Sequence, residues 1–102
     1  MMFKHFYSIS LILMLLGPGL AQASDPSLGA VTYQRHCAQC HGVNGSPTMA
    51  GATDFKRGRG TMQSDQSLLA RIQKGKNACP AYFGILSEQQ ILDVIAHIRT
   101  LF

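Results

Sequence analysis

The sequence contains no tryptophan, and its aromatic residues make up only 8% of the chain. Charged side chains are also few, at 14%, and they leave a formal net charge of only +4. A charge this small, without a basic stripe interleaved with aromatic residues, argues against nucleic-acid binding. The length of 102 residues allows one domain at most and excludes a Rossmann domain, a barrel or a multidomain enzyme.

The chain also lacks a hydrophobic run long enough to cross a bilayer, which takes about 20 residues. Its longest apolar stretch, residues 9–16, follows a short polar start and precedes a helix-breaking Gly-Pro-Gly at residues 17–19. Residues 21–23, Ala-Gln-Ala, then match a small-x-small cleavage site. We therefore predict a cleaved secretory signal over residues 1–23 and a mature domain over residues 24–102. The expected location is the periplasm or an equivalent exported compartment, with no membrane attachment after cleavage.

Cysteine is scarce, but its three copies lie at informative positions. A mature domain this short rarely stabilises itself on its own core, and it usually needs a disulfide, a metal or a cofactor. In an exported chain, one disulfide and one leftover thiol is the first arrangement to consider. The run Cys37-Ala38-Gln39-Cys40-His41 favours another, because C-x-x-C-H is the attachment signature of c-type haem.

The spacing of this motif suits the chemistry of haem attachment. The thiols of Cys37 and Cys40 add to two vinyl groups on neighbouring edges of the ring, and a helix-like turn sets the sulfurs at that separation. His41 then lies under the iron and supplies a neutral imidazole nitrogen as the proximal ligand. A thioredoxin-type redox pair would need a strand–helix–strand setting, and a zinc site would need a second ligand pair; the sequence shows neither. We predict one covalent haem c, which supplies the apolar mass that the short core lacks.

Helical signals flank the motif, without a strand pattern or an internal repeat. We expect a first helix from Leu28 to about Ala38 and an irregular, glycine-rich stretch over residues 42–63. A second helix begins at Ser64 or Asp65, either of which can serve as its N-cap, and Gly75 is placed to end it.

The last helix has the clearest pattern. Ser87 and Gln90 form a capping box, and an apolar stripe at helical spacing follows them. The stripe consists of Ile91, Val94, Ile95, Ile98, Leu101 and Phe102. We expect this helix to pack on the first helix at Gly29 and Tyr33, because a glycine permits close approach. His97 lies off the stripe and is expected on the solvated surface. The predicted fold is all-α, with three main helices wrapped around one haem.

Taken together, these residues resemble a small class I monohaem cytochrome c of a bacterial periplasm. The resemblance covers nearly the whole mature chain. It rests on Leu28 to Tyr33 in the first helix, the motif Cys37 to Gly42, the loop anchor Asp54-Phe55, Leu68 to Gly75 in the middle helix and Leu86 to Leu101 in the last. It implies one-electron transfer with a redox partner protein rather than catalysis. Consistently, the sequence shows no nucleophile–base pair, carboxylate pair or phosphate-binding loop.

The chain departs from this family at the sixth iron ligand, which is usually a methionine in a Met-Pro pair shortly before the last helix. Cys79 stands at that place, and Pro80 is kept. The register, and the presence of an otherwise odd cysteine in an oxidising compartment, favour Cys79 as a thiolate ligand of the iron. The alternatives are Met62, which no proline follows; Met49 or His97; and an open site with Cys79 paired to another chain.

A thiolate ligand changes the expected chemistry. Methionine is neutral and favours ferrous iron, whereas a thiolate stabilises ferric iron and lowers the reduction potential. On reduction the iron holds the thiolate less firmly, and release of Cys79 opens a position for NO or CO. With this ligand pair, the chain resembles the haem subunits of thiosulfate-oxidising cytochromes and the small paired cytochromes of anammox-type bacteria. A second cytochrome subunit, in a hetero- or homodimer, is therefore a candidate partner.

Further candidates surround this centre. Contacts with the haem are expected from Val43, Pro47, Phe55 and Pro80. A basic cluster, consisting of Lys56, Arg57 and Arg59, is either a solvated loop face or a site for a haem propionate or an acidic partner. The apolar run at residues 82–86 is expected to pack over the distal side of the haem, and an exposed part of it would indicate a dimer interface.

Overall fold

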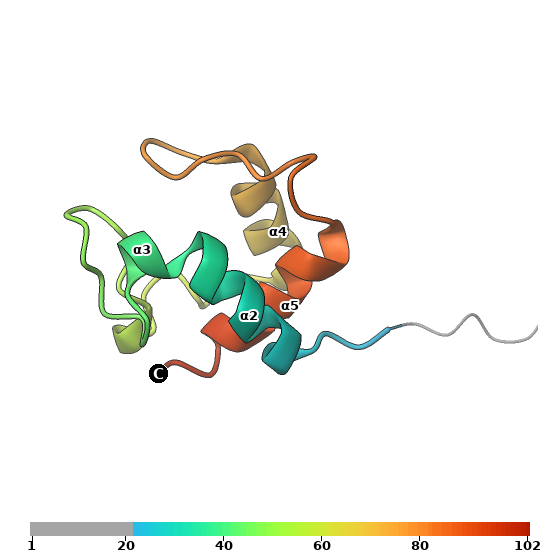
Figure 1. Ribbon diagram of the computed structural model, residues 1–102, viewed down its shortest axis with the longest axis horizontal. Coiled ribbons are helices and arrows are strands. Elements are labelled where there is room, and N and C mark those ends of the chain that lie inside the picture. Colours follow the sequence, from blue (N-terminus) through green and yellow to red (C-terminus); the bar gives the residue numbers. More distant parts are fainter. Residues whose placement is uncertain (1–21) are drawn as a thin grey trace, which may run out of the picture.

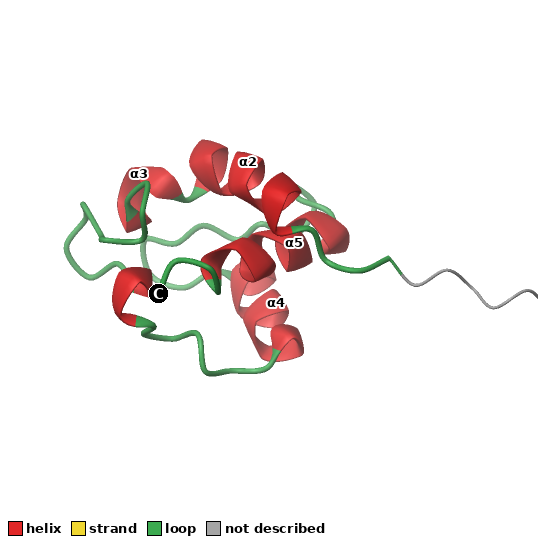
Figure 2. Cartoon of the chain, turned by 90° about the horizontal axis from the view of Figure 1, so that it is seen from below, coloured by secondary structure: helices red, strands yellow, loops and turns green. Residues whose placement is uncertain are grey.

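The computed structural model describes residues 22–102 (Figure 1). Its helices are α2 (Pro26–His36), α3 (Ala38–His41), the 3₁₀ helix η1 (Phe55–Arg57), α4 (Asp65–Lys74) and α5 (Glu88–Ile98). These residues contain isolated bridges but no strand, so the predicted all-α class is confirmed (Figure 2). Over the same range, no helix has the length and apolar character needed to span a membrane. The predicted signal, residues 1–23, lies outside the described residues except for positions 22 and 23.

Helices α2 and α5 cross in direct contact, as both ribbon views show (Figure 1, Figure 2). Gly29 is buried at the crossing, and a β-carbon at this position would lie 1.9 Å from the carbonyl oxygen of Asp93. Only glycine therefore allows the two backbones to come this close. Tyr33, on the next turn of α2, is fully buried. The predicted pairing of the Gly29/Tyr33 face with the last helix is confirmed.

The first helix begins earlier than the predicted Leu28. Asp25 is its N-cap, and the carboxylate accepts hydrogen bonds from the backbone N–H groups of Ser27 at 2.8 Å and Leu28 at 3.3 Å. Pro26 occupies the first helical position, where its missing N–H costs nothing. The backbone N–H of Asp25 also donates to the carboxylate of Asp93 at 2.8 Å. The start of α2 is thereby tied to α5.

The predicted capping box of α5 is confirmed. The Ser87 hydroxyl accepts from the backbone N–H of Gln90 at 3.1 Å, and the Gln90 side chain accepts from the N–H of Ser87 at 2.9 Å. The buried members of the predicted stripe are Ile91, Val94, Ile95 and Ile98. Leu101 and Phe102 lie beyond the helix, which ends at Ile98. Leu101 is half-buried and still packs against the cluster that contains Val94 and Ile98, whereas the stripe is wrong for Phe102, which is 58% exposed.

His97 is not the solvated residue that its position off the stripe predicted. Its ring packs against Tyr33 with the centroids 5.0 Å apart, and its Nε2 atom is buried without a hydrogen-bond partner. Burial lowers the pKa of His97. The expectation failed because α2 covers a wider face of α5 than the aliphatic residues alone mark out.

Two apolar clusters lie on α5. One joins it to α4 and the chain before it, and contains Leu69, Tyr82, Leu86, Ile91 and Ile95. The other joins it to α2 and α3, and contains Tyr33, Ala38, Val94 and Ile98. Figure 1 shows α4 with the segment at residues 75–86 above α5, and α3 with the segment at residues 42–60 to the left. The two cysteine-bearing regions thus rest on separate clusters of one shared helix.

The irregular stretch before α4 is fastened by one side chain. The guanidinium of Arg99, at the end of α5, donates to the carbonyl oxygens of Thr61 and Gln63, the latter at 2.9 Å, and to the Asp65 carboxylate at 2.7 Å. Thr61 is buried at 2% exposure. The predicted limits of α4 are confirmed, since Ser64 caps its start and the helix ends before a glycine.

Candidate haem site

The haem motif occupies a single helical turn directly after α2. The N–H of Cys37 donates to the carbonyl of Tyr33 at 2.8 Å and so closes α2. The carbonyl of Cys37 then accepts from the N–H groups of Cys40 at 3.2 Å and His41 at 3.0 Å, which opens α3. Residues three apart on a helix are neighbours on one face. The local fold therefore presents the two thiols side by side, as attachment to one ring requires.

The ring of His41 is held in a defined orientation. Its Nδ1 lies 3.0 Å from the carbonyl oxygen of Thr53, which is an acceptor, so Nδ1 carries the proton and Nε2 keeps the free lone pair. Phe55 stacks on the imidazole with centroids 4.3 Å apart and an interplanar angle of 16°. A carbonyl partner on the second nitrogen is the usual support of a metal-bound histidine. The residues present therefore fit a haem iron bound at Nε2.

The end of the motif is anchored to α2 by Tyr33. Its hydroxyl donates to the carbonyl of Gly42 at 2.7 Å, in a buried position. Burial, followed by the nearby Cys37 thiolate, raises the pKa of Tyr33 to about 12, so the hydroxyl remains a donor across the physiological range. Thr48 adds a second anchor, because its hydroxyl donates to the carbonyl of Gln39 at 2.7 Å.

Cys79 lies at the end of a tight turn. The N–H and carbonyl of Cys79 bond to the carbonyl and N–H of Lys76, each at 3.0 Å, and Asn77 between them has a left-handed φ of 54°. Gly75 precedes the turn with a φ of 72°, and a β-carbon there would lie 2.8 Å from the carbonyl oxygen of Cys79. Local geometry thus fixes the backbone at Cys79.

The loop that carries Cys79 meets the segment that leads into the haem motif. The Tyr82 hydroxyl, three residues after Cys79, bonds to the carbonyl of His36, directly before Cys37, at 3.0 Å. Burial, followed by the charges of Cys79 and Cys40, raises the pKa of Cys37 to about 12. The pKa of Tyr82 is also raised, first by burial and then by the charges of the three cysteines. All three cysteines are half-buried, and none of them is in a disulfide.

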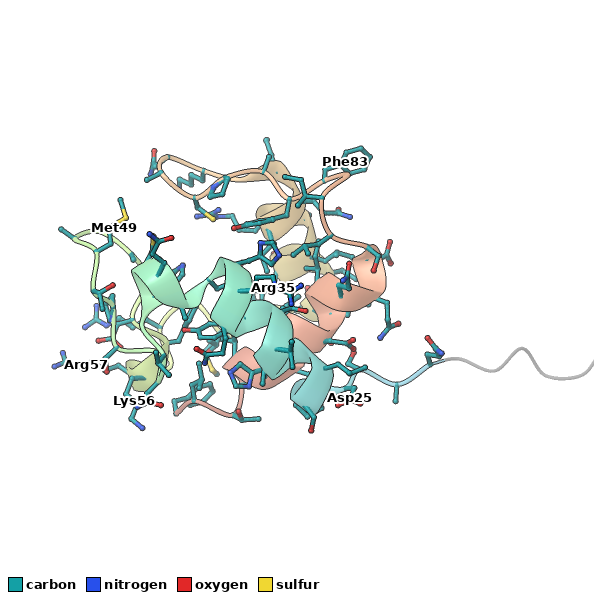
Figure 3. All side chains as sticks on the ribbon, in the orientation of Figure 1. Asp25, Arg35, Met49, Lys56, Arg57 and Phe83 are labelled. Atoms are coloured by element: carbon teal, nitrogen blue, oxygen red, sulfur yellow. The ribbon has the colours of Figure 1, made fainter. Side chains whose placement is uncertain are left out.

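The alternative sixth ligands lie in less suitable surroundings. Met62 is 90% exposed, and Met49 is 42% exposed. Figure 3 shows Met49 on the outer loop beside α3, pointing away from the helices. His97 is packed against Tyr33 on α5, as described above. Of the predicted ring contacts, Val43, Pro47 and Pro80 are exposed, and only Phe55 packs on a motif residue.

Two contacts at the site could not be foreseen from the sequence. One is the Thr53 carbonyl that orients His41, and the other is a hydrogen bond of 3.0 Å from the Tyr82 hydroxyl to the carbonyl of His36. Both acceptors are backbone atoms, which carry no residue-type signal. The ring of Tyr82 also meets the His36 ring edge-on, with centroids 5.7 Å apart.

The surface around the site has a basic side and an apolar tip. The cluster of Lys56, Arg57 and Arg59 is exposed, and Figure 3 shows the first two extending outward from η1. Arg57 forms an exposed ion pair with Asp54 at 3.5 Å. The expectation for residues 82–86 is wrong in part, because Phe83 is 78% exposed and Ile85 is 61% exposed while Tyr82 and Leu86 are buried. A tight turn between two buried anchors projects the middle residues outward.

Comparison with known proteins shows the family of the chain. Residues 24–98 match the family described as Cytochrome C oxidase, cbb3-type, subunit III. Cytochrome c6 of Thermostichus vulcanus is 36% identical over 100 residues, covering 93% of this chain and 89% of that protein. Cytochrome c6 of Synechococcus sp. (strain ATCC 27167 / PCC 6312) is 39% identical over 80 residues, covering 76% of this chain and 71% of that protein.

An all-α fold with a C-x-x-C-H turn and an oriented histidine defines a small monohaem c-type cytochrome. The chain belongs to this family, on the side of the cytochrome c6 proteins. It therefore carries one covalently bound haem c and is an electron carrier rather than a catalyst. When bound, the haem supplies an iron that exchanges one electron.

Proposed function

We propose that this chain is an exported one-electron carrier whose haem iron is held by His41 and Cys79 and has a low reduction potential. Cys37 and Cys40 attach the haem, and Phe55 and the Thr53 carbonyl orient the His41 ring. The observation that carries the proposal is the position of the closed turn at Cys79, because Tyr82 on the same loop bonds to the carbonyl of His36, directly before Cys37, at 3.0 Å. A thiolate ligand would stabilise ferric iron and lower the potential.

Replacing Cys79 by methionine tests the ligand directly. Cys79→Met exchanges an anionic ligand for a neutral one that favours ferrous iron, so the midpoint potential should rise by on the order of 0.2 V or more. Met62→Leu serves as the matched control, because Met62 is the exposed alternative and its removal should leave the potential unchanged. A negligible shift in Cys79→Met, or a large one in Met62→Leu, would contradict the assignment.

A second candidate function is reversible binding of NO or CO. It is supported by the sparse contacts of the Cys79 sulfur, whose one hydrogen bond within the described residues is a long 3.9 Å contact to the carbonyl of Pro80. A ligand held this loosely by the protein can leave once reduction weakens its bond to iron. The optical spectrum of the reduced protein should then change on addition of CO, and an unchanged spectrum would exclude this function.

The surface supports association with another redox protein, either a soluble partner or a second cytochrome subunit in a hetero- or homodimer. Exposed Phe83 and Ile85 lie on the same loop as Cys79, and exposed Lys74 and Lys76 flank it. An apolar tip with a basic rim suits a partner of the opposite rim charge. Phe83→Ser should slow electron exchange with such a partner, while Val31→Ser, on the exposed side of α2, should not.

A further inference from the structure

Tyr82 joins the loop that carries Cys79 to the helix that precedes the haem motif. We propose that Tyr82 is a positioning residue, whose hydroxyl bond to the His36 carbonyl keeps Cys79 beside the iron in the reduced protein. This inference rests on the proposed ligation by His41 and Cys79. It adds the structural element that decides how readily the distal ligand is exchanged.

The other hydrogen bonds of the loop do not reach the haem motif. The turn closes on itself between Lys76 and Cys79, and the N–H groups of Tyr82 and Phe83 donate to carbonyls of α4, at 3.1 Å to Ile72 and at 3.2 Å to Gln73. These bonds fix the shape of the loop and its attachment to α4. They leave its position relative to α2 and α3 to side-chain contacts.

The Tyr82 hydroxyl makes that link. Its bond to the His36 carbonyl, at 3.0 Å, is the one hydrogen bond between residues 75–86 and residues 22–61 among those described. His36 directly precedes Cys37, so the bond ends at the residue next to the haem motif. Tyr82 is 9% exposed, and its ring is fixed edge-on against His36 and within the α4–α5 cluster. A partly buried donor with one acceptor loses that interaction entirely when the loop moves away.

The bond therefore opposes opening of the distal side. With the haem bound as proposed, an iron–thiolate bond would hold the loop in the ferric state, and Tyr82 would add little to the retention of Cys79. Reduction would weaken that bond, and the tether would then contribute a larger share of what keeps Cys79 in place. Losing one hydrogen bond of this kind shifts a local opening equilibrium by roughly three- to tenfold.

The test compares two hydroxyl-removing variants of the haem-loaded protein. Tyr82→Phe removes the tether but keeps the ring, and Thr61→Val removes a part-buried hydroxyl bond of 2.7 Å to the Gly58 carbonyl, away from the haem motif. The rate of CO binding to each reduced protein is measured by stopped flow. Tyr82→Phe should bind CO roughly three- to tenfold faster than the parent, and Thr61→Val should bind at the parental rate.

The outcomes separate this proposal from the one on which it rests. An unchanged CO rate in Tyr82→Phe, or an equal increase in both variants, overturns the role of Tyr82. Electron paramagnetic resonance of the ferric parent reports the distal ligand independently. A ferric spectrum without thiolate character would overturn the His41/Cys79 assignment and the tether together, whereas a thiolate spectrum in all three proteins with equal CO rates would overturn the tether alone.

Discussion

The two sides of the haem site differ in how many separate contacts hold them. On the motif side, the turn at Cys37 to His41 is backed by the Tyr33–Gly42 bond, the Thr53–His41 bond and the stacked ring of Phe55. On the other side, Cys79 ends a turn that bonds to itself and meets the motif through Tyr82. In the proposed ligation, His41 is held by several contacts, whereas Cys79 lies on a loop with one tether. Exchange of ligands is therefore expected on the Cys79 side first.

The largest effect should come from breaking the crossing on which both sides depend. Gly29→Ala places a β-carbon 1.9 Å from the Asp93 carbonyl oxygen, so α2 must move off α5. We expect a loss of about 3 kcal/mol in the free energy of unfolding, near the upper end for overpacking a core. Denaturant titration measures it, and Val31→Ala, on the exposed side of the same helix, is the control. A change below about 0.5 kcal/mol would show that the crossing is looser than described.

Replacing Gly75 should have a smaller effect on the structure, confined to the Cys79 side of the haem site. Gly75→Ala combines a left-handed φ of 72° with β-carbon distances of 2.7 Å to the Ala81 nitrogen and 2.8 Å to the Cys79 carbonyl oxygen. Gly84→Ala, in the same loop, has a similar φ of 79° but no atom within 4 Å of its β-carbon. The two variants share the backbone strain, of about 1 kcal/mol, and differ in the clash.

The ferric optical spectrum distinguishes these two glycines. Gly75→Ala should displace Cys79 and shift the thiolate bands, whereas Gly84→Ala should lower stability slightly and leave the bands in place. If both variants kept the parental spectrum, the turn would not control the position of Cys79. The Cys79 side would then not be positioned by the turn between Lys76 and Cys79.

The smallest effect is a pH dependence on the motif side. The pKa of His97 is lowered in the folded state by burial, below its ordinary value of 6.5. The folded protein therefore binds this proton less readily than the unfolded chain, and the contribution of neutral His97 to stability is fully present above pH 6.5. It is lost as the pH falls from there through the folded pKa.

His97→Gln gives the matched comparison, since glutamine is polar but does not titrate. The drop in the free energy of unfolding between pH 7.5 and pH 5 should be smaller in His97→Gln than in the parent, as followed by urea titration at each pH. Equal drops would assign the acid sensitivity to other groups.

The sequence predicts local features such as helix caps well. It predicts contacts between distant segments only where a small residue indicates a close approach. The capping box at Ser87 and Gln90 is a signal within four residues, and the glycine at position 29 marks a close approach because no other residue tolerates it. His97 was misplaced because aliphatic periodicity alone does not show how wide the α2 contact is. The first helix begins at Pro26 rather than at the predicted Leu28, because Asp25 caps it ahead of the proline.

The candidate site also has a part that the sequence predicts and a part that it does not. Cys37, Cys40 and His41 are adjacent in sequence, so one motif gives both their identity and their geometry. The carbonyl of Thr53 orients the His41 ring and the carbonyl of His36 binds the Tyr82 hydroxyl, and every residue has such a group. Phe55, which the sequence predicts as a haem contact, stacks on His41. Which backbone carbonyl oxygen contacts which side-chain ring depends on the folded structure and has no signal in the sequence.

The contact between Asp25 and Asp93 also has a consequence in time. The first helix finds its packing partner, and the backbone bond that fixes its start, on the last helix of the chain. On the export route proposed above, a chain that leaves the channel N-terminus first displays Cys37 and Cys40 before residue 93 arrives. The crossing of α2 and α5 therefore cannot form until residue 93 has followed, which leaves an interval for attachment at the two thiols.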